Sequence, residues 1–224
     1  PVEVEVRARR TAPDRVEVEL PGYAQATIGF AAAYPPAPPA ALPALAAPRA
    51  APIAADRLYA DRWMFHGPRY AGVTALGPLD DGGVDGVIDT LPAPGALLDC
   101  AGQLMGWWVM ERERVDRLAM PVRIERLRLY GDHPAPGVPV ACRVRFRAIG
   151  DRSVVADHEL VVGGRLWACA DGWEDRRFDS DDALWKVLRY PEHHALAEPQ
   201  PGGWVATREH WRTAASRELV MRRY

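Results

Sequence analysis

One apolar stretch, residues 95–110, constrains the fold more than any other part of the sequence. It reads Gly-Ala-Leu-Leu-Asp-Cys-Ala-Gly-Gln-Leu-Met-Gly-Trp-Trp-Val-Met, follows the turn residues 91–94 and runs into the charged residues 111–114. Its apolar residues recur at helical spacings but cover most of the circumference, which is typical of a buried helix. With about sixteen residues it is shorter than the ~20 apolar residues that span a bilayer. The sequence therefore predicts a central buried helix over residues 95–113.

Two polar side chains, Asp99 and Gln103, interrupt this apolar surface, and a spacing of four makes them neighbours on one helix face. A carboxyl group inside such a helix is unfavourable unless it is hydrogen-bonded, paired or neutralised. Two interpretations remain open from spacing alone. Asp99 could help to cap the helix start while Gln103 satisfies a backbone group, or Asp99 could be a catalytic acid that Gln103 orients.

Three glycines, Gly95, Gly102 and Gly106, lie in the same stretch. Each costs a helix roughly 1 kcal/mol relative to alanine. We therefore expect another part of the molecule, or a thin ligand arm, to pack closely against the helix backbone.

Composition limits the class of protein. Hydrophobic residues make up 48% of the 224 residues, and the formal net charge is −2. The first value allows a sizeable core, and the second gives no general attraction to nucleic acid or to an anionic membrane. The three cysteines lack metal-ligand spacing, so we expect no metal site and small buried thiols in a reducing cytoplasm. No signal peptide or transmembrane run is predicted, and because the first residue is proline we expect a piece of a longer protein.

The rest of the chain alternates in the manner of strands. A small antiparallel meander is predicted near the start, and residues 35–54 are rich in proline and alanine, which predicts an extended linker. A short helix is expected over residues 55–65, and further helical pieces in the tail over residues 183–189 and 208–223. The predicted strands are residues 2–8, 15–20, 24–30, 71–79, 84–90, 121–130, 138–149, 153–162 and 165–173, with a hairpin turn at residues 80–83.

Two strands, a long buried helix and then four strands predict an α+β hotdog fold, in which a twisted antiparallel sheet wraps around one central helix. Several short motifs in this region resemble those of the dehydratase domain of polyketide synthases, a double hotdog. They are residues 66–73, similar to Y/H-G-P-x-F-x-G, residues 96–103, similar to L-L-D-x-x-x-Q/H, residues 120–124, similar to L-P-x-x-I, and residues 158–165, similar to D-x-x-G. Residues 172–178 and 211–224 resemble the iterative, enediyne-type branch.

The resemblance implies a domain organisation and an activity. Residues 1–34 would be the trailing strands of a first hotdog, residues 55–180 the second hotdog, and residues 181–224 a tail toward a following domain. The activity would be elimination of water from 3-hydroxyacyl thioesters, which the phosphopantetheine arm of an acyl carrier protein presents without a directly bound cofactor. Neighbouring synthase domains and a homodimer are further implied partners. Arg69 and residues 123–128 could meet the acidic carrier protein, although a solvated strand face explains these arginines equally well.

Elimination requires a base at C2 of the substrate and an acid at the departing hydroxyl. By resemblance, Asp99 is the acid and Gln103 orients it. We expect the substrate to be bound by Tyr59, Phe65, His66, Gly67, Pro68 and Tyr70, with His66 packed at the mouth of a channel; core packing is an open alternative for the aromatic residues.

One departure from the family pattern affects activity. The family base is a histidine in a His-x3-Gly-x4-Pro motif, and none of the six histidines here fits it. The base then lies upstream or has been lost, and we expect the isolated fragment to be inactive. Two alternatives stay open: a hotdog thioesterase, in which a carboxylate directs water at the thioester, and a non-catalytic hotdog half that supports dimerisation or carrier docking.

Overall fold

The computed structural model describes residues 3–113, 116–178, 182–190, 193, 197–200, 204–207 and 220–223. It divides the chain into two compact units, Pro1–Pro36 and Ala37–Tyr224. The first unit is an antiparallel meander of β1 (Arg7–Ala12), β2 (Arg15–Leu20) and β3 (Ala24–Gly29), in that order.

The first strand begins later than the sequence pattern predicts. Alternation predicts a strand over residues 2–8, but residues 3–6 lie outside β1. The turn at residues 13–14 brings Ala12 opposite Arg15 and Arg7 opposite Glu19, close to the end of β2. Val6 would face Leu20, the last residue of β2, and the residues before Val6 would face the turn that follows, so they have no strand to pair with.

The second unit contains one six-stranded antiparallel sheet in the order β4-β5-β7-β8-β9-β6. The predicted hairpin is confirmed, because Asp80 pairs with Gly83 across a two-residue turn. The strands are β4 (Val73–Asp80), β5 (Gly83–Asp89), β6 (Ala119–Leu129), β7 (Pro139–Ile149), β8 (Ser153–Val162) and β9 (Arg165–Arg177). The short helix α1 (Ala55–Ala60) precedes them and is shorter than predicted.

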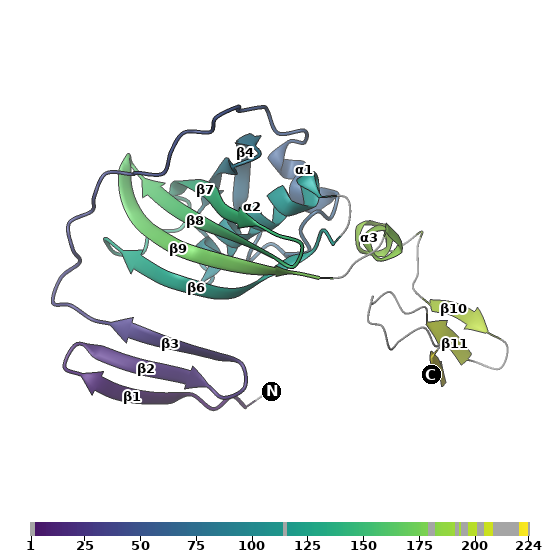
Figure 1. Ribbon diagram of the computed structural model, residues 1–224, viewed down its shortest axis with the longest axis horizontal. Helices are drawn as coiled ribbons and strands as arrows, with labels where there is room; N and C mark the ends of the chain where they lie inside the picture. The colour runs from purple at the N-terminus through teal and green to yellow at the C-terminus, as the bar shows by residue number, and fades with distance from the viewer. Residues whose placement is uncertain are drawn as a thin grey trace. The chain divides into compact units, whose positions relative to one another are not determined.

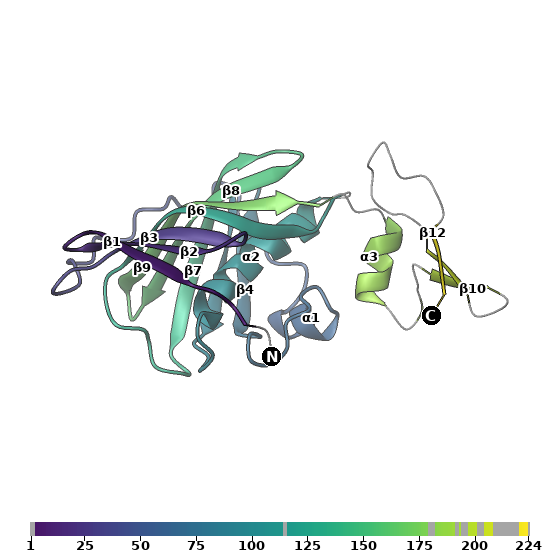
Figure 2. The same cartoon turned by 90° about the horizontal axis from the view of Figure 1, so that it is seen from below.

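The sheet curves around the helix α2 (Ala96–Arg112), which lies against one of its faces (Figure 1), and the same layering is visible after a 90° turn (Figure 2). The predicted buried helix is thus confirmed, and the fold is a hotdog. Trp107 and Trp108 are fully enclosed, and the Trp108 indole donates a hydrogen bond to the Asp80 carbonyl at 2.8 Å. This bond ties the middle of the helix to the β4–β5 turn.

The glycine prediction holds at Gly102. A Cβ atom there would lie 3.0 Å from Cζ2 of Trp173, so the β9 indole packs directly on the helix backbone. At Gly106 a Cβ atom would meet Met64 at an ordinary 3.5 Å. Gly95 is the residue before the helix and adopts a left-handed conformation with φ of 79°, which a side chain would disfavour.

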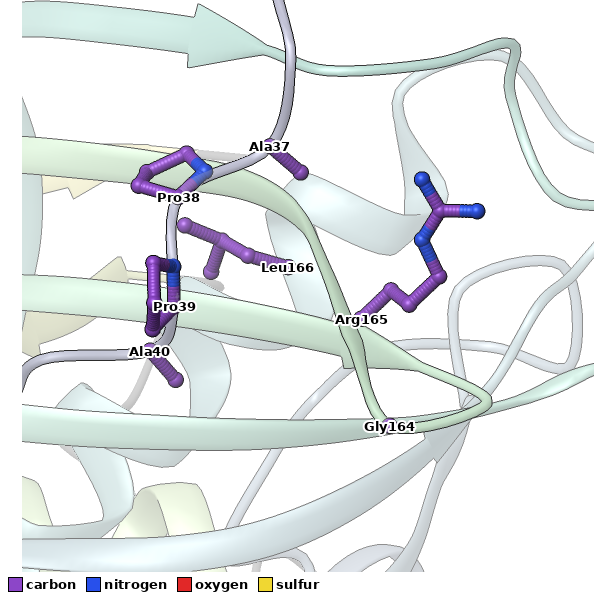
Figure 3. A pocket seen from close by; sticks show the side chains of 7 residues that line it. All are labelled: Ala37, Pro38, Pro39, Ala40, Gly164, Arg165 and Leu166. Atoms are coloured by element: carbon purple, nitrogen blue, oxygen red, sulfur yellow. The ribbon is translucent and has the colours of Figure 1, made fainter.

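The proline-rich segment lies on the second unit along residues 41–49. Glu159 accepts hydrogen bonds from the backbone N–H groups of Ala41 and Leu42, and Arg145 donates one to the Pro43 carbonyl. Further along, Arg49 and Leu79 exchange backbone hydrogen bonds. We refer to residues 37–53 as the strap. Its first part, residues 37–40, faces residues 164–166 of the β8–β9 hairpin across a cavity of about 200 Å³ (Figure 3).

The C-terminal region begins with α3 (Asp182–Arg189), as predicted. The Trp185 ring packs on Trp63 with centroids 5.6 Å apart, and the Arg189 guanidinium covers the same Trp63 ring at 4.1 Å. A small antiparallel sheet follows, formed by β10 (Ala197–Gln200), β11 (Trp204–Thr207) and β12 (Val220–Arg223). The helix predicted over residues 208–223 is therefore wrong at its end, and residues 208–219 lie outside the described residues.

Among the residues that the structure describes, no helix is both long and apolar enough to cross a membrane. Nor does that part of the chain bring three or more His, Cys, Asp or Glu side chains together in a way that could hold a metal ion.

Candidate active site

Asp99 lies in the first turn of α2, where the otherwise buried helix reaches the surface. The residue before the helix is Gly95, and no side chain caps the helix start. The Asp99 side chain is 40% exposed, whereas Cys100 beside it is fully buried. The capping interpretation of Asp99 therefore fails, and its carboxyl group sits at the border between core and solvent.

Gln103 holds this carboxyl group in place. Its Nε2 donates to Asp99 Oδ2 at 2.7 Å and to the Tyr70 carbonyl at 2.7 Å, which uses both amide hydrogens. Its Oε1 accepts from the Tyr59 hydroxyl at 2.8 Å, and that hydroxyl in turn accepts from the Val73 N–H at 3.0 Å. Because the Val73 N–H leaves the Tyr59 hydrogen free to point at Oε1, the amide orientation is defined. A flipped amide would face two acceptors with its oxygen.

His66 reaches the same carboxylate from the loop after α1. Its Nε2 lies 3.4 Å from Asp99 Oδ2, and its side chain is only 16% exposed. The Phe65 ring stacks on the imidazole with centroids 4.3 Å apart and planes 20° apart. Burial lowers the pKa of His66, and the nearby Asp99 opposes that shift. The loop therefore places a mostly buried, neutral imidazole against the acid.

Two further polar groups, the Cys100 thiol and the Tyr59 hydroxyl, lie on the buried side of the site. The Cys100 thiol donates to the same Tyr70 carbonyl at 3.3 Å, and burial raises the pKa of this thiol to about 11. Burial likewise raises the pKa of the Tyr59 hydroxyl, with the Val73 N–H opposing it. Both groups therefore stay protonated near neutral pH, and neither is a nucleophile or a base there.

The structure brings together five of the eight predicted site residues: Asp99, Gln103, Tyr59, His66 and Tyr70. Phe65 is 71% exposed and touches the group only through His66. Gly67 and Pro68 are exposed turn residues, and the Gly67 carbonyl accepts the Tyr70 N–H. Sequence reasoning missed Cys100 and the Val73 N–H, which carry no signal of their own beyond their proximity to the motifs.

Among the described residues, no cavity encloses the Asp99 carboxyl group. Two cavities lie along the strap, the one in Figure 3 and another of about 620 Å³ next to Asp80 and Arg145, and Asp99 lines neither of them. In the part of the chain that the structure describes, the site is thus a partly exposed carboxyl group that the Gln103 amide holds in place.

A curved antiparallel sheet around a single helix defines a hotdog protein, and here the first turn of that helix carries a carboxyl group fixed by Gln103. A sequence model described as the polyketide synthase dehydratase N-terminal domain matches residues 34–183. The chain therefore belongs to the polyketide synthase dehydratase family, and it is a dehydratase region, a hydro-lyase.

Solved structures share the fold. The dehydratase domain of a mycocerosic acid synthase-like polyketide synthase aligns with a TM-score of 0.53 and 24% identity, over 79% of this chain and 68% of that one. The dehydratase-cyclase domain of ambruticin biosynthesis aligns with a TM-score of 0.52 and 18% identity, over 78% of this chain and 68% of that domain. A trans-AT polyketide synthase dehydratase domain from Brevibacillus brevis aligns with a TM-score of 0.55 and 16% identity, over 79% of this chain and 64% of that domain. No curated protein matches the sequence.

Proposed function

We propose that this chain supplies the acid side of an elimination on 3-hydroxyacyl thioesters, with Asp99 as the acid. A base removes the C2 proton, the C2–H electron pair forms the C2=C3 bond, and the C3–O bond breaks. The departing hydroxyl takes a proton from Asp99 and leaves as water. The products are an enoyl thioester, a carboxylate on Asp99 and a protonated base, and proton transfer from that base restores the starting state.

The observation that carries this proposal is the fixed orientation of the Asp99 carboxyl group. Gln103 occupies Oδ2, and Gln103 is itself fixed by Tyr59 and the Tyr70 carbonyl. A general acid contributes most when its geometry is set before the substrate arrives. No other described carboxyl group is held in this way at the border of the apolar core, next to the motifs that resemble the family's catalytic helix.

The substrate in this proposal arrives on the phosphopantetheine arm of an acyl carrier protein, and no cofactor binds directly. Arg69 is exposed in the same loop as His66 and suits an acidic partner. The strand arginines are less available. Arg128 pairs with Asp171 at 2.6 Å, and Arg123 with Glu125 at 3.8 Å. The face of β6 therefore fits a solvated strand better than a docking surface.

In this proposal the base is a histidine of the first hotdog half, because none of the six histidines of this chain lies in a His-x3-Gly-x4-Pro motif. His66 has its Nε2 against Asp99, and its Nδ1 is buried without a hydrogen-bond partner among the described residues. In this proposal His66 therefore acts on Asp99 rather than on the substrate. We assign residues 55–180 to the second half of a double hotdog, although the matching family model is described as an N-terminal domain. The Asp-x3-Gln helix supports our assignment, and the first half would supply the histidine and the cover over Asp99.

Asp99→Asn in the full-length protein tests the proposal. Asparagine keeps the shape but has no acidic proton, so turnover of a 3-hydroxyacyl thioester should fall at least about 100-fold, with thermal unfolding nearly unchanged. A variant with most of its turnover would remove Asp99 from the mechanism. In the same assay the isolated chain should be inactive, and a longer polypeptide that begins upstream should be active.

The products distinguish the other functions. Release of free 3-hydroxy acid without prior elimination would identify a thioesterase. No turnover by the full-length protein, together with binding of the carrier protein, would identify a structural or docking half. We further propose that the protein is a cytoplasmic homodimer. Sedimentation of the full-length protein measures its oligomeric state.

A further inference from the structure

We propose that His66 is a positioning residue that, together with Gln103, restricts the acidic proton of Asp99 to Oδ1. This inference rests on the proposed function, because it concerns the same acid. It starts from the contact between His66 Nε2 and Asp99 Oδ2, which the sequence motifs do not reveal.

The protonation of the imidazole follows from its surroundings. Nδ1 is buried and has no hydrogen-bond partner among the described residues, whereas Nε2 faces a carboxylate oxygen at 3.4 Å. A hydrogen on Nδ1 would be a buried donor without an acceptor, which is rarer in proteins than an unpaired acceptor. The neutral ring therefore carries its hydrogen on Nε2, the nitrogen that lies 3.4 Å from Asp99 Oδ2. Burial also lowers the pKa of His66, which favours this neutral form near pH 7.

The two oxygens of Asp99 then differ. Oδ2 receives the Gln103 amide at 2.7 Å and faces the His66 N–H at 3.4 Å, a distance that commonly shortens when a substrate binds. Oδ1 has no hydrogen bond to a described residue. A proton on Oδ2 would meet two donors, so the carboxylic acid places its proton on Oδ1. The leaving hydroxyl must accordingly approach Oδ1.

The ring is held where this role requires it. Phe65 stacks on one face of the imidazole, although Phe65 itself is exposed. The titratable groups that act on the Asp99 side of the site are His66 from the loop, Cys100 from α2 and Tyr59 from α1. Cys100 and Tyr59 stay protonated, so among the described residues His66 and Gln103 are the groups that set the proton position.

The test compares His66→Phe, His66→Gln and Asp99→Asn in the full-length protein, with a 3-hydroxyacyl N-acetylcysteamine thioester as substrate. His66→Phe keeps a flat ring but loses the donor, and kcat should fall roughly 10–100-fold with KM nearly unchanged. His66→Gln places an amide N–H near Oδ2 and should restore most of the loss. His133→Phe is the matched control, because His133 is exposed, packs on Trp167 and should leave kcat unchanged.

The outcomes separate the two proposals. Wild-type kcat in His66→Phe overturns the positioning role. A loss in His66→Gln as large as in His66→Phe also overturns it, because a neutral donor would then not suffice. If Asp99→Asn turns over like the wild type, the proposed function itself fails, whatever the His66 variants do. Thermal unfolding of each variant excludes a folding defect as the cause.

Discussion

At the scale of single residues, this unit holds acid–base groups in opposite environments. Asp99 stays 40% exposed, whereas His158 and Asp175 are each 1% exposed. Trp173 connects the two buried groups. Its ring lies 4.7 Å from the His158 ring, and its Nε1 donates to Asp175 Oδ1 at 3.0 Å. No substrate can reach these two groups without unfolding, so their protonation affects stability.

Their effects on stability have opposite signs. Burial lowers the pKa of His158 from 6.5 to about 4, against the influence of Asp157 and the Ala101 backbone. The stability contributed by neutral His158 is present above pH 6.5 and is lost as the pH falls toward 4. Burial raises the pKa of Asp175 from 3.8 to about 6, against the Trp173 hydrogen bond. The stability contributed by protonated Asp175 is present below pH 3.8 and is lost as the pH rises through 6.

We predict that His158→Gln changes the pH dependence of unfolding. Each pH unit in this window corresponds to ~1.4 kcal/mol, so the wild type should lose about 2 kcal/mol from His158 between pH 6.5 and 5. The variant lacks this loss and keeps the opposing gain from Asp175. Its free energy of unfolding in urea should therefore rise relative to the wild type as the pH falls from 7 to 5. Equal pH slopes for the two proteins would contradict a neutral, buried His158.

Part of the site is predictable from the sequence at this scale. The spacing of Asp99 and Gln103 fixes their contact, because a helix of any packing makes them neighbours. The approach of His66 and Tyr59 is not predictable in that way. Both reach α2 from α1 and the irregular residues after it, whose path has no periodicity. The Tyr59 hydroxyl bonds Gln103 Oε1 and also the Val73 N–H, a backbone group that no sequence motif marks.

At the scale of elements, the contact between α2 and β9 depends on the absence of a side chain at Gly102. Trp173 packs on Gly102, and this indole cannot move away freely, because it is 4% exposed, stacks on His158 and donates to Asp175. Gly106 is one turn further along the same helix, and its nearest neighbour is the flexible end of Met64 at 3.5 Å. Close packing of Trp173 therefore requires a glycine at position 102, whereas the space around Gly106 would accept a methyl group.

The variants Gly102→Ala and Gly106→Ala should change stability in opposite directions. Alanine favours a helix over glycine by ~1 kcal/mol at both positions. At Gly102 the added Cβ forces the Trp173 ring outward, and overpacking of ~1–3 kcal/mol should outweigh that gain. At Gly106 the gain should remain. Thermal unfolding of both variants measures the difference, and a stabilised Gly102→Ala would show that the indole can yield.

The elements themselves were predictable where the hydrophobic pattern and the turns agree. The predicted limits of the central helix, residues 95–113, differ from α2 by one residue at each end, since Gly95 and Glu113 are its flanking residues. The pattern misplaces β1, because alternation alone does not say where the partner strand ends. Residues 220–223 form a strand in place of the predicted helix because they pair with β11.

At the scale of the whole chain, composition predicts the conformation of the strap but not where it lies on the fold. Proline and alanine predict an extended segment, and the segment is extended. Its position is set by charged side chains far away in the sequence: Glu159 lies 118 residues from Ala41, and Arg145 lies 102 residues from Pro43. Asp80 accepts the Ala47 N–H at 3.1 Å. Burial tends to raise the pKa of Asp80, but the N–H groups around it, that of Ala47 first, hold it below its usual value.

Glu159 anchors the first part of the strap. It is 5% exposed, and its Oε1 accepts two backbone N–H groups at 2.6 Å and 3.1 Å. A buried carboxylate is unfavourable unless it is hydrogen-bonded in this way, and the strap amides in turn have no strand partner. Each side therefore stabilises the other, and neither is expected to keep its position alone.

Glu159→Leu removes the acceptor while keeping a similar volume. Two unpaired amides should cost ~1–3 kcal/mol locally. Hydrogen exchange in a peptide covering residues 38–46 should then accelerate at least about tenfold at Ala41 and Leu42. Glu125→Leu is the matched control on β6, because Glu125 is exposed, pairs with Arg123 and Arg147, and packs on Gly172 rather than on the strap. Unchanged exchange at Ala41 and Leu42 would mean that Asp80 and Arg145 hold the strap without Glu159. We expect the faster hydrogen exchange in Glu159→Leu to be confined to residues 38–46 and to be absent from α2. This result would show that Glu159 stabilises the strap and that the hotdog core is stable without it.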